Sequence, residues 1–182
     1  MTATATYVAL LRGINVGGRS LVPMAELRAL FTSLGLADVQ TYIQSGNVVF
    51  TADAGEEEEL AARIEAALAE AFGIDPAVLL RTPAELERVA RESPYLAPDA
   101  DLSKLHVVFL DRAPPASAAA ELDPARSPPD DFTVAGRELY LRLPNGAGRS
   151  KLTLDYFERV LGVRGTQRNW NTVLKLLELA KR

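Results

Sequence analysis

The amino-acid sequence predicts an α+β protein with two βαββαβ halves, a linker helix between them and a further helix at the C-terminal end. Short apolar runs that suit strands alternate with segments whose apolar residues recur every three or four positions, as in amphipathic helices. The same order of segments occurs twice along the 182 residues. A hydrophobic fraction of 48% is normal for a globular protein and argues against disorder.

The first half opens with a strand at 7–11 that is apolar on both faces, as in a central strand. An amphipathic helix follows between Pro23 and Gly35. A hairpin then places strands at 39–44 and 48–51 around the turn signal Ser45-Gly46-Asn47. A helix from Glu56 to Gly73 and a strand at 78–81 complete the half.

Thr82 and Glu85 form a predicted capping box, so residues 83–92 are expected to be helical, and residues 83–104 are interpreted as a linker. The second half then repeats the order: strand 105–110, helix 116–122, strands 132–135 and 138–143, helix 152–161, strand 163–167, and a last helix 169–181. Each half matches the split βαβ, ferredoxin-like plan. We therefore predict one compact unit made of residues 1–82, 83–104 and 105–182, with duplication inferred from the architecture alone.

The composition limits the chemistry. Cysteine is absent, which excludes disulfides, thiolate metal sites and thiol nucleophiles, and the single histidine, His106, cannot build a zinc site alone. We expect no metal and no cofactor. No apolar run approaches the roughly 20 residues that span a bilayer, and the N-terminus has no basic leader, so a cytoplasmic protein without membrane contact is expected.

The net charge of −4 is spread unevenly. Residues 1–92 hold 7 basic and 13 acidic side chains, whereas residues 132–182 hold 10 basic and 4 acidic ones. Such asymmetry can mark an anion-binding surface. The alternative is that the acidic excess reflects Glu56 to Glu59 at the start of a helix, where carboxylates face the positive end of its dipole.

Three polar stretches are candidates for a binding site. Arg12-Gly13-Ile14-Asn15-Val16-Gly17-Gly18 joins a strand to a helix, where loop N–H groups can converge on an anion, although it is neither a dinucleotide fingerprint nor a P-loop. The loop 143–151 enters a helix with Ser150 as the expected N-cap and Lys151 beside it. Arg168, Asn169 and Trp170 open the last helix, where Asn169 can cap and Trp170 can stack on a ligand or pack in the core.

Each of these stretches also has a structural interpretation: a glycine turn, a capped helix with solvated flanks, or a packing anchor. Ser45-Gly46-Asn47 is first of all a hairpin turn. Adjacent Ser150 and Lys151 point about 100° apart on a helix, which disfavours direct serine–lysine catalysis. No pair of carboxylates has a spacing that singles it out for acid–base work, so the catalytic residues are unknown.

The motifs RGINVGG, MAELRALFTSLGL, TYIQSGNVVF, GRSKLT and RNWNTVLKLLELA together resemble the domain of unknown function family numbered 1697. The resemblance covers essentially the whole chain. It implies an α+β fold of two ferredoxin-like halves in a soluble, mostly bacterial protein, and it brings no established activity. The characteristic polar positions of that family fall here on Arg12, Gly13, Asn15, Gly17, Gly18, Ser45, Gly46, Asn47, Ser150, Lys151, Arg168, Asn169 and Trp170.

Three functions follow as hypotheses. The first is a protein that binds an anionic, phosphate-containing ligand such as a nucleotide or nucleic acid; sequence-specific RNA readout is disfavoured because the RNP1 aromatic motif is absent. The second is an enzyme on a phosphorylated substrate, with Lys151 and Arg168 stabilising charge and Asn15 or Ser45 orienting the reactive group. The third is a structural or protein-partner module. The sequence leaves the ligand and the oligomeric state open.

Overall fold

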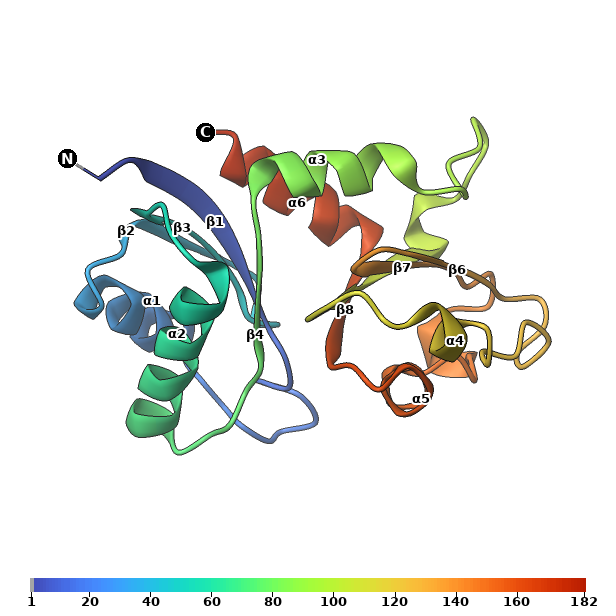
Figure 1. Ribbon diagram of the computed structural model, residues 1–182, viewed down its shortest axis with the longest axis horizontal. Coiled ribbons are helices and arrows are strands. Elements are labelled where there is room, and N and C mark those ends of the chain that lie inside the picture. The colour runs from blue at the N-terminus through green and yellow to red at the C-terminus, as the bar shows by residue number, and fades with distance from the viewer. Residues whose placement is uncertain (1) are drawn as a thin grey trace. The chain divides into compact units, whose positions relative to one another are not determined.

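The computed structural model describes residues 2–182. In this part of the chain, six α-helices and two four-stranded antiparallel sheets form a mixed α+β architecture (Figure 1). Its internal contacts define two compact units. The first unit runs to Glu87 and includes Leu176–Arg182, and the second unit is Arg88–Lys175.

The first unit contains the elements of the first predicted half. They are β1 (Thr4–Leu11), α1 (Met24–Ser33), β2 (Ala37–Tyr42), β3 (Asn47–Asp53), α2 (Glu57–Phe72) and β4 (Val78–Arg81), followed by the start of α3 (Pro83–Glu92). The sheet order is β2-β3-β1-β4, which is compatible with the predicted ferredoxin-like arrangement.

Helices α1 and α2 cover one face of this sheet. Leu27 and Phe31 of α1 and Ile64 of α2 pack against Ala9 of β1 and other inward residues of the strands. The opposite face of β1 is buried as well, as the complete burial of Val8 and Leu10 shows. This two-sided burial explains why the strand is a continuous apolar run instead of an alternating one.

The second unit repeats the order of elements with different lengths. Its elements are β5 (Leu105–Leu110), α4 (Ala116–Ala119), β6 (Asp131–Ala135), β7 (Glu138–Arg142), α5 (Leu154–Leu161) and β8 (Gly165–Asn169), followed by α6 (Trp170–Ala180). The sheet order is β6-β7-β5-β8. Tyr156, Phe157 and Leu161 of α5 pack on Val108 and Leu139 of the sheet.

Local polar contacts explain where several elements begin. The predicted capping box is confirmed, because the Thr82 hydroxyl accepts from the Glu85 N–H at 3.2 Å and the Glu85 carboxylate accepts from the Thr82 N–H at 2.8 Å. The Asn169 side chain accepts from the Thr172 N–H at 2.9 Å and caps α6, as predicted. The predicted cap of α5 is wrong: Thr153 caps that helix.

The two sheets share their register. Val8 of β1 pairs with Arg81 of β4, and Val107 of β5 pairs with Arg168 of β8. Each of these arginines is buried, and each is followed at once by the residue that caps the next helix. The two sheets therefore correspond strand by strand and residue by residue in their pairing, although the amino acids at the surrounding positions differ.

Candidate functional site

Two loops at one end of the first sheet lie together. We call residues 12–22, which follow β1, and residues 43–46, which join β2 to β3, the paired loops. The Leu11 N–H donates to the Gly46 carbonyl at 2.9 Å, and the Asn15 side-chain amide donates to the Gln44 carbonyl at 2.8 Å. The structure thus brings together two of the predicted motifs, because the antiparallel pairing of β1 with β3 places the loop after β1 and the loop before β3 at the same end of the sheet.

Asn15 links the paired loops because both polar atoms of its side chain form hydrogen bonds with loop backbone. Its Oδ1 accepts from the Val22 N–H at 2.7 Å, and its Nδ2 donates to the Val22 carbonyl at 3.1 Å as well as to Gln44. Its φ of 53° lies in the left-handed region that asparagine tolerates. The polar atoms of Asn15 therefore bond to the loop backbone, which indicates a supporting role in the loops.

Gly46 is required by crowding as well as by its backbone angle. Its φ is +83°, and a Cβ built there would lie 2.8 Å from Cδ1 of Ile14 and 2.9 Å from Cβ of Leu11. Ile14 is 1% exposed, so it has little room to move. Absence of a side chain at Gly46 lets the first loop pack directly on the second.

Ser45 and Asn47 stabilise the hairpin turn. Asn47 is fully buried, and its Nδ2 donates to the Tyr42 carbonyl at 3.0 Å and to Oγ of Ser45 at 2.9 Å. The predicted turn is confirmed, but it begins earlier than expected, since β2 ends at Tyr42. Buried Asn47 has a structural role here.

The tip of the first loop presents backbone N–H groups to solvent. Val16 and Arg19 form a β-bridge, and the Arg19 N–H donates to the Val16 carbonyl at 3.0 Å. Gly17 and Gly18 between them have φ values of 58° and 74°, as in a two-residue hairpin turn. Both glycines are exposed, and within residues 2–182 their N–H groups donate no hydrogen bond.

The sequence of the paired loops contains positively charged side chains and no negatively charged ones. Residues 1–25 contain Arg12 and Arg19 but no carboxylate, and residues 39–52 contain no charged side chain. Arg12 is partly buried at the end of β1, where its N–H donates to the Ala77 carbonyl. Arg19 is exposed and makes no ion pair with any residue of 2–182. An anion at the tip would meet backbone donors followed in the chain by an exposed arginine.

Three large apolar side chains on the paired loops are exposed, which sequence reasoning missed. Val16 is 63%, Leu21 69% and Ile43 50% exposed. We call these three residues the apolar rim. Ile43 also has a φ of +48°, a strained conformation for a β-branched residue. At Ile43, exposure of an apolar side chain and backbone strain coincide, a combination that is found at ligand-contacting positions.

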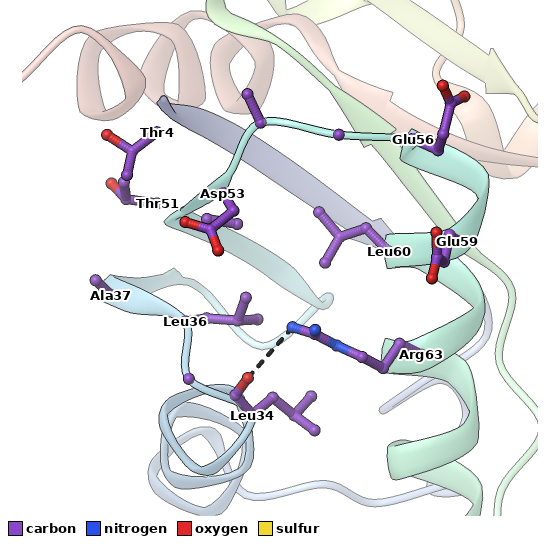
Figure 2. A pocket seen from close by; sticks show the side chains of 14 residues that line it. Thr4, Leu34, Leu36, Ala37, Thr51, Asp53, Glu56, Glu59, Leu60 and Arg63 are labelled. Carbon is purple, nitrogen blue, oxygen red and sulfur yellow. Dashed lines mark hydrogen bonds between the residues drawn. The ribbon is translucent and has the colours of Figure 1, made fainter. Parts of the chain in front are cut away.

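A pocket of about 470 Å³ lies at the opposite end of the same sheet (Figure 2). It includes Asp53, Glu56 and Glu59, and the guanidinium of Arg63 donates to the Leu34 carbonyl at 3.2 Å. None of the predicted site residues lines it. Since carboxylates dominate its charge, this pocket is unsuited to a phosphate group.

The candidate motif at 149–151 lies in the second unit and contacts a different segment. The Lys151 N–H donates to Oγ of Ser127 at 3.0 Å, and Nε of Arg126 donates to the Lys151 carbonyl at 2.8 Å. Ser150 uses its Oγ to accept from the Leu152 N–H at 2.9 Å, which gives a local turn instead of the expected cap. The side chain of Lys151 is exposed.

The motif at 168–170 is mainly structural. Arg168 is 6% exposed; its Nη1 donates to Oγ1 of Thr166 at 2.6 Å, and burial lowers its pKa to about 10. Trp170 is 2% exposed, so its ring offers no open face to a ligand, and the stacking interpretation gives way to the packing one. Asn169 is occupied as a helix cap.

Sequence reasoning also missed a buried polar cluster in the second unit. Glu138 is fully buried, and its Oε1 accepts from Nη2 of Arg88 at 3.2 Å. Tyr140, two residues along β7 on the same face, is 1% exposed, and its hydroxyl has no hydrogen-bond partner within the described chain. Burial, reinforced by the Glu138 carboxylate, raises the pKa of Tyr140 to about 12. The alternating sequence of β7 gave no indication that Glu138 and Tyr140 would both be buried.

The described residues contain neither a metal-binding cluster nor a helix that could span a membrane. Among residues 2–182, no cluster of three or more histidine, aspartate and glutamate side chains has the arrangement of a metal site. No helix in this range has the length and apolar character needed to cross a bilayer. His106 of β5 is half-buried, and burial lowers its pKa.

Comparisons with known proteins identify the family. A search of curated proteins gives no match. A solved structure described as that of conserved bacterial protein SP0830 from Streptococcus pneumoniae is similar with a TM-score of 0.73; it is 23% identical, over 98% of this chain and 99% of that chain. This similarity shows the fold. A family model described as Protein of unknown function (DUF1697) matches residues 4–140. The protein therefore belongs to the DUF1697 family.

Proposed function

We propose that this protein binds a phosphate-containing anion, such as a nucleotide or a nucleic acid, at the paired loops of the first unit. The observation that carries the proposal is the glycine tip. There, Gly17 and Gly18 are exposed and their N–H groups donate no hydrogen bond within residues 2–182, and the next residue, Arg19, is exposed and makes no ion pair in that range. Such a group of donors favours an oxyanion because backbone dipoles and a positive charge act on it together.

The supporting residues give the tip a fixed shape. Asn15 and Gly46 join the first loop to the hairpin turn, so the donors are held before a ligand arrives. A site that is ordered in advance loses less conformational entropy on binding. We assign Asn15, Gly46 and Asn47 to this supporting role, and Arg12, Gly17, Gly18 and Arg19 to the ligand-facing surface.

A titration tests this proposal. Binding of ATP would be measured by calorimetry for the wild type, for Arg19→Gln and for Arg63→Gln. We expect Arg19→Gln to weaken binding about tenfold, because a charge-assisted hydrogen bond is lost. Arg63→Gln removes an equal charge at the acidic end of the sheet and should leave the affinity unchanged. Equal affinities for all three proteins, or no binding of phosphate compounds at all, would contradict the proposal.

An enzyme acting on a phosphorylated substrate is the second candidate. The side chains first considered for catalysis support it poorly, since Asn15 and Ser45 bond to the loops and Arg168 is buried within β8. Of the residues considered for catalysis, Lys151 is exposed at the surface. Comparing phosphatase and nuclease activities of the wild type and Lys151→Ala would show whether this residue has a catalytic part.

The second half offers a natural contrast within the same chain, and we propose that the two halves arose by duplication and diverged in their loops. By strand register, Asp111 holds the place of Arg12, Arg137 that of Gly46 and Glu138 that of Asn47. Asp111 pairs with Arg112 and Arg164 at 3.6 Å. At this end of the second sheet the two arginines are therefore engaged by a carboxylate of the same cluster, whereas Arg19 makes no ion pair within residues 2–182.

A further inference from the structure

We propose that the phosphate-containing ligand of the paired loops is a single-stranded nucleic acid, which contacts the apolar rim through its bases and sugars. This inference rests on the proposed function. It adds a role for Val16, Leu21 and Ile43, which a free phosphate compound would leave unused. The paired loops would then carry both parts of the contact, with phosphates at the glycine tip and nucleosides on the rim.

The shape of the site favours a polymer. Small ligands bury most of their surface in concave pockets. The pocket of about 470 Å³ at the acidic end of the first sheet, and another of about 420 Å³ in the second unit beside Tyr95 and Lys104, are lined by other residues, whereas the glycine tip and the rim are exposed. An extended strand can lie across an exposed surface and gain affinity from several small contacts, as KH domains do when a glycine loop holds the backbone of RNA.

The chemistry favours an unpaired strand over a duplex and over an acidic protein segment. Cation and apolar side chains alternate closely along the tip, where Arg19 lies between Val16 and Leu21. A single strand presents phosphates and open base faces at a similar short repeat. In a duplex the base faces are stacked inside, so the apolar rim would have no partner. Exposed N–H groups at Gly17 and Gly18 add donors that suit phosphate oxygens.

Ile43 supplies the most specific evidence. Its φ of +48° is a conformation that asparagine or glycine adopts with little cost, and its side chain is half exposed to solvent. Half of the isoleucine surface stays exposed, so burial in the isolated fold offsets only part of the cost of this backbone conformation. Contact with an apolar group of the ligand gives this side chain a function.

Fluorescence anisotropy with labelled single-stranded oligonucleotides of 12 nucleotides, at about 50 and 200 mM salt, tests the inference. The proteins would be the wild type, Arg19→Gln, Ile43→Asn and the control Leu102→Asn, which replaces an exposed leucine of the second unit. We expect Ile43→Asn to weaken oligonucleotide binding about fivefold while leaving the binding of inorganic tripolyphosphate, which has no base or sugar, unchanged. Arg19→Gln should weaken both ligands and reduce the salt slope by about 0.7. Leu102→Asn should match the wild type.

The possible failures are distinguishable. If ATP binds at the tip but oligonucleotides bind no more tightly, or if Ile43→Asn leaves oligonucleotide binding unchanged, the inference is overturned and the proposed function stands. If neither ligand binds, the proposed function fails with it. If the apolar rim instead proves necessary for capture of an acidic peptide of mixed aspartate and leucine, and oligonucleotides do not compete, the occupant is a protein and the inference is also overturned. A thermal melt of each variant confirms that the fold is intact.

Discussion

At the scale of single residues, Gly46 is the position where one added methyl group has the largest expected effect. Alanine there would combine a left-handed φ with a Cβ less than 3 Å from Ile14 and Leu11. We expect Gly46→Ala to lower the free energy of unfolding by about 3 kcal/mol, measured by urea denaturation.

Gly18→Ala is the matched control for this prediction. Gly18 has a similar φ of +74°, but a Cβ there would have no neighbour within 4 Å. The left-handed backbone conformation alone should lower the free energy of unfolding of Gly18→Ala by about 1 kcal/mol. Equal losses for the two variants would show that the loops do not pack as described.

Asn15 allows a second prediction, based on nearly isosteric replacement. Asn15→Asp keeps the acceptor for the Val22 N–H but replaces two donors by an oxygen that faces the Val22 and Gln44 carbonyls. We expect a loss of about 2 kcal/mol at pH 7, at least as large as for Asn15→Ala. Below about pH 4 the carboxyl group is protonated and can donate again, so the deficit of Asn15→Asp relative to the wild type should shrink. A deficit independent of pH would be inconsistent with the assigned donors.

Tyr140 gives a prediction about alkaline pH. Its folded-state pKa of about 12 exceeds the ordinary value of 10.0, so the stability that this neutral phenol contributes is complete below pH 10 and is lost as pH rises towards about 12. Tyr140→Phe removes the ionisable group together with a hydroxyl that lacks a hydrogen-bond partner in the described chain. We expect the variant to lose less stability than the wild type between pH 9 and 11.5 in urea denaturation. Parallel losses in the two proteins would refute this assignment.

At the scale of elements, the start of α6 depends on the Asn169 cap. Asn169→Ala should destabilise the protein by about 1 kcal/mol, because the Thr172 N–H loses its acceptor. Asn169→Asp keeps an acceptor of equal quality and should restore most of that stability. Thermal unfolding of both variants separates the cap from other roles of the residue; identical losses would argue against a capping role.

The order of elements was predictable because it depends on periodicity. Apolar spacing identified the strands and helices of both halves, and turn residues located the hairpin before β3. Boundaries were less predictable where signals overlap. In Ser150-Lys151-Leu152-Thr153 both hydroxyl residues suit a helix cap, and only tertiary packing selects Thr153. Similarly, the alternation through Gln44 hides the earlier end of β2.

The candidate site was only partly predictable, for a physical reason. The sequence contained the glycine loop and the hairpin turn, but their convergence follows from the pairing of β1 with β3, a contact between distant residues. Polarity suggested that Asn15 and Asn47 faced a ligand, whereas the fold uses their amides to satisfy its own carbonyl groups. Exposure of Val16, Leu21 and Ile43 depends on the loop conformation and had no sequence signal.

At the scale of the whole molecule, the two ends of the first sheet carry different charged side chains. Asp53, Glu56 and Glu59 line the pocket at one end, whereas the paired loops themselves contain two arginines and no carboxylate. The net charge of −4 therefore does not describe the surface that a ligand meets at the loops. Family membership and the shared fold are consistent with this account but do not assign the ligand.

The central claim is that the paired loops bind phosphate, and amide chemical shifts tested by NMR address it most directly. In a ¹⁵N-labelled protein titrated with ATP, we expect concentration-dependent shifts at Gly17, Gly18 and Arg19, with smaller changes across residues 42–47. The amides of Asp53 to Arg63, at the acidic end of the sheet, should stay unchanged. Shifts confined to that acidic end, or no shifts at the loops at saturating ATP, would contradict the account.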